Sequence, residues 1–161
     1  MLRKKAQQKG FTIVELLIVI VVIGILAALV LNTFSGVQRR ARDTERVTDV
    51  NSIATQLEVY YGDNGHYPTL ANLQDATPNT GWVDTNLPGI DAQAMIAPND
   101  TPAANANSMT SDATPPADEY GYVPAPANCD NGAGGNCTSF TLYWAKEDDN
   151  NASQSKSSLN Q

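Results

Sequence analysis

The stretch KGFTIVELLIV, residues 9–19, places one glutamate near the start of an apolar run that continues to Leu31. A carboxylate at the centre of a membrane helix costs about 2.5–3.5 kcal/mol on insertion scales, and such residues usually serve a function. The cost is lower near a helix end, but a neutral residue would still insert better there. Glu15 is therefore expected to meet a partner group.

The apolar run itself predicts a membrane helix. It covers 21 residues, 11–31, and is polar only at Thr12 and Glu15. At about 1.5 Å per residue it reaches about 30 Å, the hydrocarbon thickness of a bilayer. A cleavable secretory signal usually has a shorter apolar core, so we expect this segment to remain as an anchor. Basic residues flank both ends, so the positive-inside rule does not decide the orientation.

The charge of the chain is distributed unevenly. The net charge is −7, but from Asn51 onward two lysines stand against thirteen acidic residues, which gives −11. So acidic a surface repels nucleic acid, and no general nucleic-acid binding is expected. The chain has no serine elbow, P-loop or dinucleotide glycine pattern, so we expect neither an enzyme nor a cofactor-binding protein.

The two cysteines, Cys129 and Cys137, have seven residues between them. They could form half a metal site, two free thiols or a disulfide. With His66 as the one histidine and no second cysteine pair, four metal ligands are not completed, and no metal site is expected. A disulfide fits best if this part lies outside the cytoplasm, and we adopt the N-terminus inside.

The residues after the anchor predict an amphipathic helix over residues 35–62. Its apolar positions are spaced 3, 4, 3, 4 and form one helical face, which Ile53 and Tyr60 widen: Val47, Val50, Ala54, Leu57 and Tyr61. The cluster of Gly62, Asp63, Asn64 and Gly65 should end it. Arginines at 39, 40, 42 and 46 alternate with acidic residues, so a solvated or inter-subunit face is expected there.

Two late segments, 119–123 and 138–145, carry alternating aromatic and β-branched residues that predict strands. We expect a hairpin over 119–145 whose loop is closed by the cysteines and whose apolar face covers the helix. The fold class is then α+β: a long N-terminal helix packed against a small C-terminal antiparallel β-sheet.

The remaining segments are expected to be irregular. Residues 63–118 are predicted to be a variable loop region, with short strand or packing segments at 82–83 and 94–96 and an exposed, mobile part at 98–117. Residues 146–161 are predicted to be a disordered polar tail. Its acidic run at 147–149 could help to hold calcium, but a solvated acidic end is favoured because no EF-hand spacing supports a site.

Lys9-Gly10 followed by Phe11-Thr12-x-x-Glu15, opening an apolar helix, resembles the type IV pilin and pseudopilin family. The resemblance is close from Lys9 to about Pro68. It implies a leader peptide over 1–10, a cut between Gly10 and Phe11 by a prepilin peptidase, methylation of the new Phe11 amine, and a hydrophobic membrane and filament-core helix over 11–34. It implies the type IV pilin fold.

The same resemblance implies a partner for Glu15. In the family this glutamate pairs with the N-terminal amine of a subunit, in trans during assembly or in cis within one chain, so Glu15 is expected to select the stagger of subunits. Many pilins carry a proline where this chain has Asn32, so melting of the helix between Gly24 and Asn32 is less assured here.

The leading interpretation of function is a major pilin that polymerises into an extracellular filament for adhesion, twitching motility or DNA uptake. The alternative is a pseudopilin or minor pilin of a type II secretion or competence system. Residues 60–69 resemble the helix-end signature of major pseudopilins, whereas the cysteine-closed hairpin and the acidic surface favour a displayed pilus.

The partners implied are further copies of the chain, the prepilin peptidase and N-methyltransferase, an inner-membrane assembly platform and, indirectly, a cytoplasmic assembly ATPase. The precursor is expected to be a single-pass protein of the cytoplasmic membrane, and the assembled subunit to lie in a pilus on the cell surface.

Overall fold

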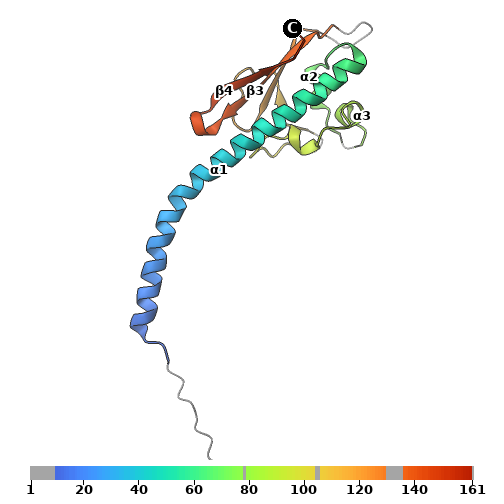
Figure 1. Ribbon diagram of the computed structural model, residues 1–161. Helices are drawn as coiled ribbons and strands as arrows, with labels where there is room; N and C mark the ends of the chain where they lie inside the picture. The colour runs from blue at the N-terminus through green and yellow to red at the C-terminus, as the bar shows by residue number, and fades with distance from the viewer. Residues whose placement is uncertain (1–9, 78, 104–105, 130–135, 161) are drawn as a thin grey trace, which may run out of the picture. The chain divides into compact units, whose positions relative to one another are not determined.

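The computed structural model describes residues 10–77, 79–103, 106–129 and 136–160, with the side chains of 31–33 left out. The predicted leader peptide, 1–10, therefore lies almost entirely outside the described residues. The chain divides into two compact units, Met1–Gln38 and Arg39–Gln161. We call them the anchor unit and the head and describe each by itself. Helix α1, Ile13–Asn64, contributes to both (Figure 1).

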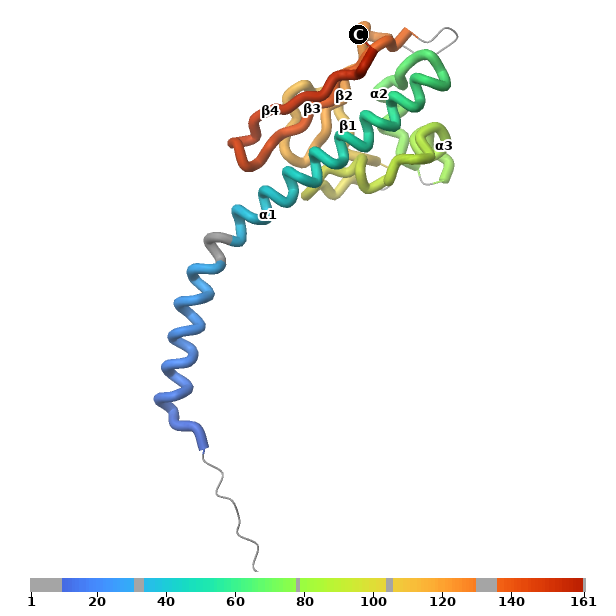
Figure 2. The backbone as a smooth tube through the Cα atoms, viewed as in Figure 1, coloured from blue at the N-terminus to red at the C-terminus, as the bar shows by residue number. Residues whose placement is uncertain are grey.

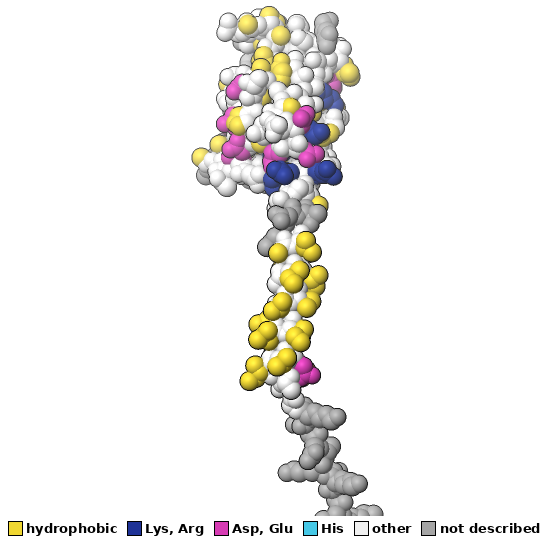
Figure 3. Space-filling view, turned by 90° about the vertical axis from the view of Figure 1, so that its left-hand side faces the viewer, with side chains coloured by type: hydrophobic (Ala, Val, Ile, Leu, Met, Phe, Trp, Pro, Cys, Tyr) yellow, Lys and Arg dark blue, Asp and Glu magenta, His cyan; other side chains and the backbone are white. Residues whose placement is uncertain are grey.

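The anchor unit presents its apolar side chains outward. The large hydrophobic residues between Phe11 and Val37 that the structure describes are 48–85% exposed. Figure 3 shows hydrophobic side chains along the visible face of this unit. Here α1 contains a stretch long and apolar enough to cross a bilayer. Exposing apolar surface to water costs about 25 cal/mol of free energy per Å², so this helix requires lipid or protein around it.

In the head, α1 packs one face against the sheet. The buried line is Val50, Ile53, Ala54, Leu57 and Tyr60. All five belong to the predicted helical face, which differs only at its margins: Val47 is 45% exposed and Tyr61 is only partly buried. The helix continues to Asn64, within the predicted breaker cluster, and Gly65 follows with a φ of 74°.

The head contains a four-stranded mixed sheet in the order β1-β2-β3-β4. The strands are β1 (Met109–Thr110), β2 (Tyr120–Ala125), β3 (Ser139–Lys146) and β4 (Ala152–Ser157). β1 and β2 are parallel, whereas β2–β3 and β3–β4 are antiparallel. Side chains of β2 and β3, among them Tyr122, Phe140 and Leu142, enter the core with α1. The α+β class and the helix-on-sheet arrangement are confirmed.

Two details of the sheet differ from the prediction. The sheet is mixed rather than antiparallel, because β1 joins β2 in parallel. The prediction of a disordered tail over 146–161 is wrong. Residues 147–149 form a 3-10 turn, η2 (Glu147–Asp149), and β4 follows. β4 has the sequence ASQSKS, and its residues alternate between partly buried and exposed. Its strand state comes from pairing with β3, not from its own composition.

The middle of the head is more ordered than expected. It contains α2 (Leu70–Gln74), α3 (Trp82–Asn86) and a 3-10 turn, η1 (Ala92–Met95), so the strand candidates at 82–83 and 94–96 are wrong. They are nevertheless packing segments, because Val83 and Met95 are buried. Figure 2 shows α3 near the C-terminal end of α1, and the rings of Tyr60 and Trp82 lie 5.2 Å apart.

The segment predicted to be mobile, 98–117, is attached to the head at several points. Ser108 donates its backbone N–H to the carbonyl of Met95 (3.0 Å), and the Asn107 side chain donates to the carbonyl of Leu73 (2.5 Å). Met109 is buried and begins β1. The prediction of an exposed, mobile segment rested on local composition. It missed these bonds because they join residues that are far apart in the sequence.

Gly121 is required where the loop after β1 crosses β2. A Cβ built at this position would lie 1.9 Å from the backbone oxygen of Asp112 and 3.0 Å from Cβ of Tyr143. The obstacle is backbone, so it cannot be relieved by a side-chain rotation.

Gly121→Ala is therefore expected to destabilise the head by about 1–3 kcal/mol, the cost typical of forcing extra atoms into a packed site. Denaturant unfolding of the full chain in detergent, followed by tryptophan fluorescence, measures it. Gly62→Ala is the matched control, because a Cβ there meets nothing within 4 Å. Equal stability of Gly121→Ala and wild type would contradict the close approach.

Candidate assembly site

The start of α1 is closed by a reciprocal pair of hydrogen bonds between Thr12 and Glu15. The Thr12 backbone N–H and hydroxyl both donate to Oε2 of Glu15, at 2.8 Å each. The Glu15 backbone N–H donates to the Thr12 hydroxyl at 3.2 Å. This is a capping box, in which each residue satisfies a donor that the first helical turn leaves without a partner.

The box places the carboxylate beside the predicted cleavage point. Phe11 immediately precedes Thr12, and consecutive Cα atoms lie about 3.8 Å apart, so an amine created at Phe11 would appear within about one residue of the N–H that Glu15 already accepts. A Cβ at Gly10 would meet nothing within 4 Å. Packing within the described part of the chain therefore does not explain the glycine.

The capping role is a function of Glu15 that our sequence analysis did not include. The signal was present, because Thr-x-x-Glu before an apolar run is the capping-box spacing. Glu15 is thus bonded locally in the uncut chain. The pairing with an amine, and the roles of Gly10 and Phe11 in processing, stay predictions.

A second cluster, which we call the arginine latch, joins α1 to the β3–β4 turn and consists of Arg42, Asp43, Arg46 and Glu147. Arg46 is fully buried and contacts Asp43 at 2.8 Å, Glu147, and the carbonyl of Ala117 at 2.9 Å. Arg42 binds both oxygens of Glu147, at 2.9 and 2.5 Å. Figure 3 shows basic and acidic side chains gathered close together on part of the head.

Asp43 completes the latch from the helix side. Its two carboxylate oxygens accept the backbone N–H groups of Glu147 (2.9 Å) and Asp148 (3.0 Å). The turn between β3 and β4 is therefore held through both its backbone and its side chain. This corrects two expectations: the arginines at 42 and 46 do not lie on a solvated face, and Glu147 is neither solvated nor available as a calcium ligand.

The latch makes the head sensitive to acid. Hydrogen bonds from Arg42 and then Arg46 lower the pKa of Glu147 from 4.5 to about 2. Because the folded pKa lies below the unfolded one, the stabilisation is complete above about pH 4.5 and is lost as the pH falls toward 2.

We expect the unfolding free energy of wild type to exceed that of Glu147→Gln by an amount that shrinks by about 3 kcal/mol between pH 6 and pH 2. Urea unfolding of both full-length proteins in detergent at a series of pH values measures this difference. A difference independent of pH would show that the latch does not hold Glu147 ionised.

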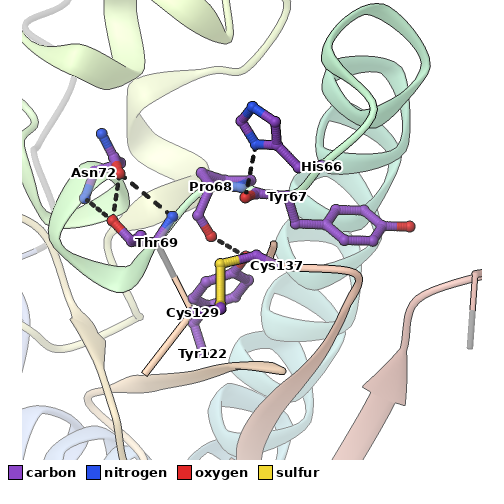
Figure 4. Close-up of a disulfide and its surroundings, with 8 residues drawn as sticks. All are labelled: His66, Tyr67, Pro68, Thr69, Asn72, Tyr122, Cys129 and Cys137. Carbon is purple, nitrogen blue, oxygen red and sulfur yellow. Dashed lines mark hydrogen bonds between the residues drawn. A yellow bond between two sulfur atoms is a disulfide. The ribbon is translucent and has the colours of Figure 1, made fainter. Parts of the chain in front are cut away.

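The predicted disulfide is present: Cys129 and Cys137 are joined at an S–S distance of 1.98 Å. It lies next to the residues that follow α1 (Figure 4). The Tyr67 backbone N–H donates to the Cys137 carbonyl (2.8 Å), and the Tyr122 hydroxyl donates to the Pro68 carbonyl (2.7 Å). The loop residues 130–135 lie outside the described part of the chain.

His66 lies in the turn after α1 and takes part in packing. Its ring is partly buried, stands edge-on to Tyr60 at 5.8 Å, and its Nδ1 lies 3.2 Å from the Tyr67 carbonyl. Within the described ranges, no three His, Cys, Asp or Glu side chains are grouped so as to hold a metal ion.

The fold and the first turn of α1 define a class: a head of helix and sheet carried on an exposed apolar helix with a capped start. Comparison with known proteins agrees with this class. Residues 5–31 match the prokaryotic N-terminal methylation motif. This motif includes Gly10, Phe11 and Glu15.

The chain is also similar to type II secretion system core protein G from several bacteria. It is 38% identical to that of Aeromonas hydrophila over 76 residues, 47% of this chain and 53% of the relative. For Escherichia coli K12 it is 40% identical over 68 residues, 42% and 47%, and for Vibrio cholerae 37% over 68 residues, 42% and 47%. The chain thus matches about half the length of these relatives. No solved structure gave a significant match.

The methylation motif and the similarity to core protein G together support the type IV pilin and type II secretion pseudopilin family. A single-pass membrane precursor fits the motif together with the apolar helix that follows it.

Proposed function

We propose that this protein is a pseudopilin: a structural subunit, not an enzyme, that is cut after Gly10, methylated at Phe11 and assembled into the short filament of a type II secretion system. The observation that carries this proposal is the similarity to core protein G of that system in several bacteria. It favours the alternative of our sequence analysis over the major pilin.

The anchor unit supports assembly by copies of the same chain. Its apolar side chains are exposed along the helix, and a subunit leaving the membrane must cover them again. Other copies of the same helix offer a surface of matching chemistry. The partners we propose are therefore the chain itself, the prepilin peptidase and N-methyltransferase, and a membrane assembly platform driven by a cytoplasmic ATPase.

Glu15 would then act in two successive states. Before the cut its carboxylate caps α1 through Thr12. After the cut a positive amine lies next to that cap, in the same chain or in a neighbouring subunit. Pairing with the amine would neutralise the carboxylate within an apolar shaft, where an unpaired charge is costly, and would favour one stagger between subunits.

Fractionation of the producing cells, with electron microscopy of sheared material, tests the proposal. We expect a chain beginning at methylated Phe11 in the membrane fraction, and secretion of exported proteins that stops when the gene is deleted. Abundant long surface filaments built of this chain, with secretion unaffected by the deletion, would overturn the pseudopilin assignment and restore the major pilin.

A further inference from the structure

The chain contains three Asn-x-Ser/Thr triplets, the acceptor pattern for N-linked glycans: Asn99-Asp100-Thr101, Asn136-Cys137-Thr138 and Asn151-Ala152-Ser153. The triplet alone is a weak signal, because it is short and common. The structure distinguishes the three by what surrounds each asparagine.

Two of the triplets are tied to the buried core of the head. In the second, the middle residue, Cys137, is fully buried and disulfide-bonded. In the first, Asp100 accepts a hydrogen bond from the buried Ser108 at 2.5 Å, and the residue two positions before Asn99, Ala97, is buried. A transferase must draw several residues around the acceptor into its active site, and these two segments cannot leave the surface without breaking core contacts.

The third triplet lies at the tip of the β3–β4 hairpin. Residues 148–151 are consecutive exposed positions, so Asn151 lies before the strand pairing begins at Ala152. Ser153 is exposed too, although it pairs with Ala145 and its hydroxyl donates to the Ala113 carbonyl at 3.2 Å. Asn150 and Asn151 have φ values of 50° and 58°, the left-handed backbone that lets the chain reverse. Among the strands that the structure describes, β4 pairs with β3 and forms an edge of the sheet, and Asn151 immediately precedes it. Asp149 precedes Asn151 by two residues and offers a carboxylate that a basic subsite of a transferase can bind.

We propose that Asn151 is a glycosylation site, modified on its side-chain nitrogen by an oligosaccharide from a lipid diphosphate donor. In the transfer Nδ2 forms a bond to C1 of the first sugar and loses one proton. The bond from C1 to the diphosphate oxygen breaks, and the lipid diphosphate leaves with the electron pair. The donor and the transferase are supplied by the cell.

The site requires the head to lie outside the cytoplasm, where such transferases act. The disulfide in the same unit supports that location, because disulfides form and persist in oxidising compartments. A glycan at the hairpin tip would also cover the start of an edge strand. Edge strands otherwise present unpaired backbone groups to other chains.

Digestion with trypsin separates the Asn151 triplet from the other two. Lys146 and Lys156 are the nearest basic residues on either side, so the peptide 147–156 contains the third triplet alone, whereas the other two lie together on 47–146. Protein purified from the organism that makes it is digested and analysed by mass spectrometry with electron-transfer fragmentation. We expect the 147–156 peptide to carry the mass of one or more sugars, placed on Asn151.

Two variants expressed in the same cells separate the acceptor pattern from general exposure. Ser153→Ala removes the hydroxyl of the triplet and should abolish the added mass, whereas Ser155→Ala, an exposed serine two residues along β4, should keep it. An unmodified 147–156 peptide, or a mass that persists in Ser153→Ala, would overturn the proposal. Processing at Phe11 is read from the same digest, so this failure would leave the pseudopilin assignment standing.

Discussion

Glu15→Ala is expected to insert into the membrane and to be cut after Gly10, yet to enter filaments less well by a factor on the order of 10² to 10³ when it is the only subunit. The substitution leaves the Phe11 amine without its partner in an apolar shaft, and breaking such a buried pair costs about 3–5 kcal/mol. The measurement is the amount of the chain in sheared filaments of an overexpressing strain, divided by the processed chain in the membrane. Wild-type subunits supplied together with the variant should partly restore its incorporation.

The capping box provides the controls for this experiment. Glu15→Gln retains an acceptor for Thr12 but has no charge, so it should assemble as poorly as Glu15→Ala. Thr12→Ala removes the cap at a cost of about 0.5–2 kcal/mol but keeps the carboxylate, so it should assemble well. If Glu15→Gln assembled normally and Thr12→Ala failed, Glu15 would act through helix capping and the proposed ion pair would be rejected.

Arg46→Met is expected to destabilise the head by about 3–5 kcal/mol, because it removes the one fully buried cation of the latch and leaves carboxylates of Asp43 and Glu147 short of a partner. Denaturant unfolding of the full chain in detergent, followed by tryptophan fluorescence, gives the change. Methionine fills a similar volume, so the loss reflects charge and hydrogen bonds more than a cavity.

Arg39→Met is the matched control, because Arg39 is exposed and a substitution at such a position usually changes stability by less than about 0.5 kcal/mol. Adding Glu147→Gln to Arg46→Met should recover part of the lost stability, since a buried amide costs less than a buried carboxylate short of a partner. If Arg46→Met and Arg39→Met unfolded at the same denaturant concentration, the latch would not stabilise the head.

Only part of the arginine latch could be predicted from the sequence. The spacing of Arg42, Asp43 and Arg46 on one helix was visible in the sequence, but their partner Glu147 is 101 residues further on than Arg46. The acidic run at 147–149 looked like a solvated end, because nothing local to it indicates an arginine. Glu147 is partly buried because the turn between β3 and β4 lies against α1, where it meets Arg42, Asp43 and Arg46.

The sequence by itself determined the features that depend on neighbouring residues. The apolar run, the breaker cluster after Tyr61 and the aromatic hairpin strands are local patterns, and each appears at or near its predicted place. The Gly10-Phe11 junction with Glu15 four residues on is a local pattern too, and its processing stays a prediction. The tertiary structure decided the rest: that a polar ASQSKS segment becomes a strand, that Val47 on the predicted apolar face stays exposed, and that Arg46 is internal. The physical reason is that pairing, burial and charge compensation depend on groups brought together by folding, and short-range sequence patterns do not contain those contacts.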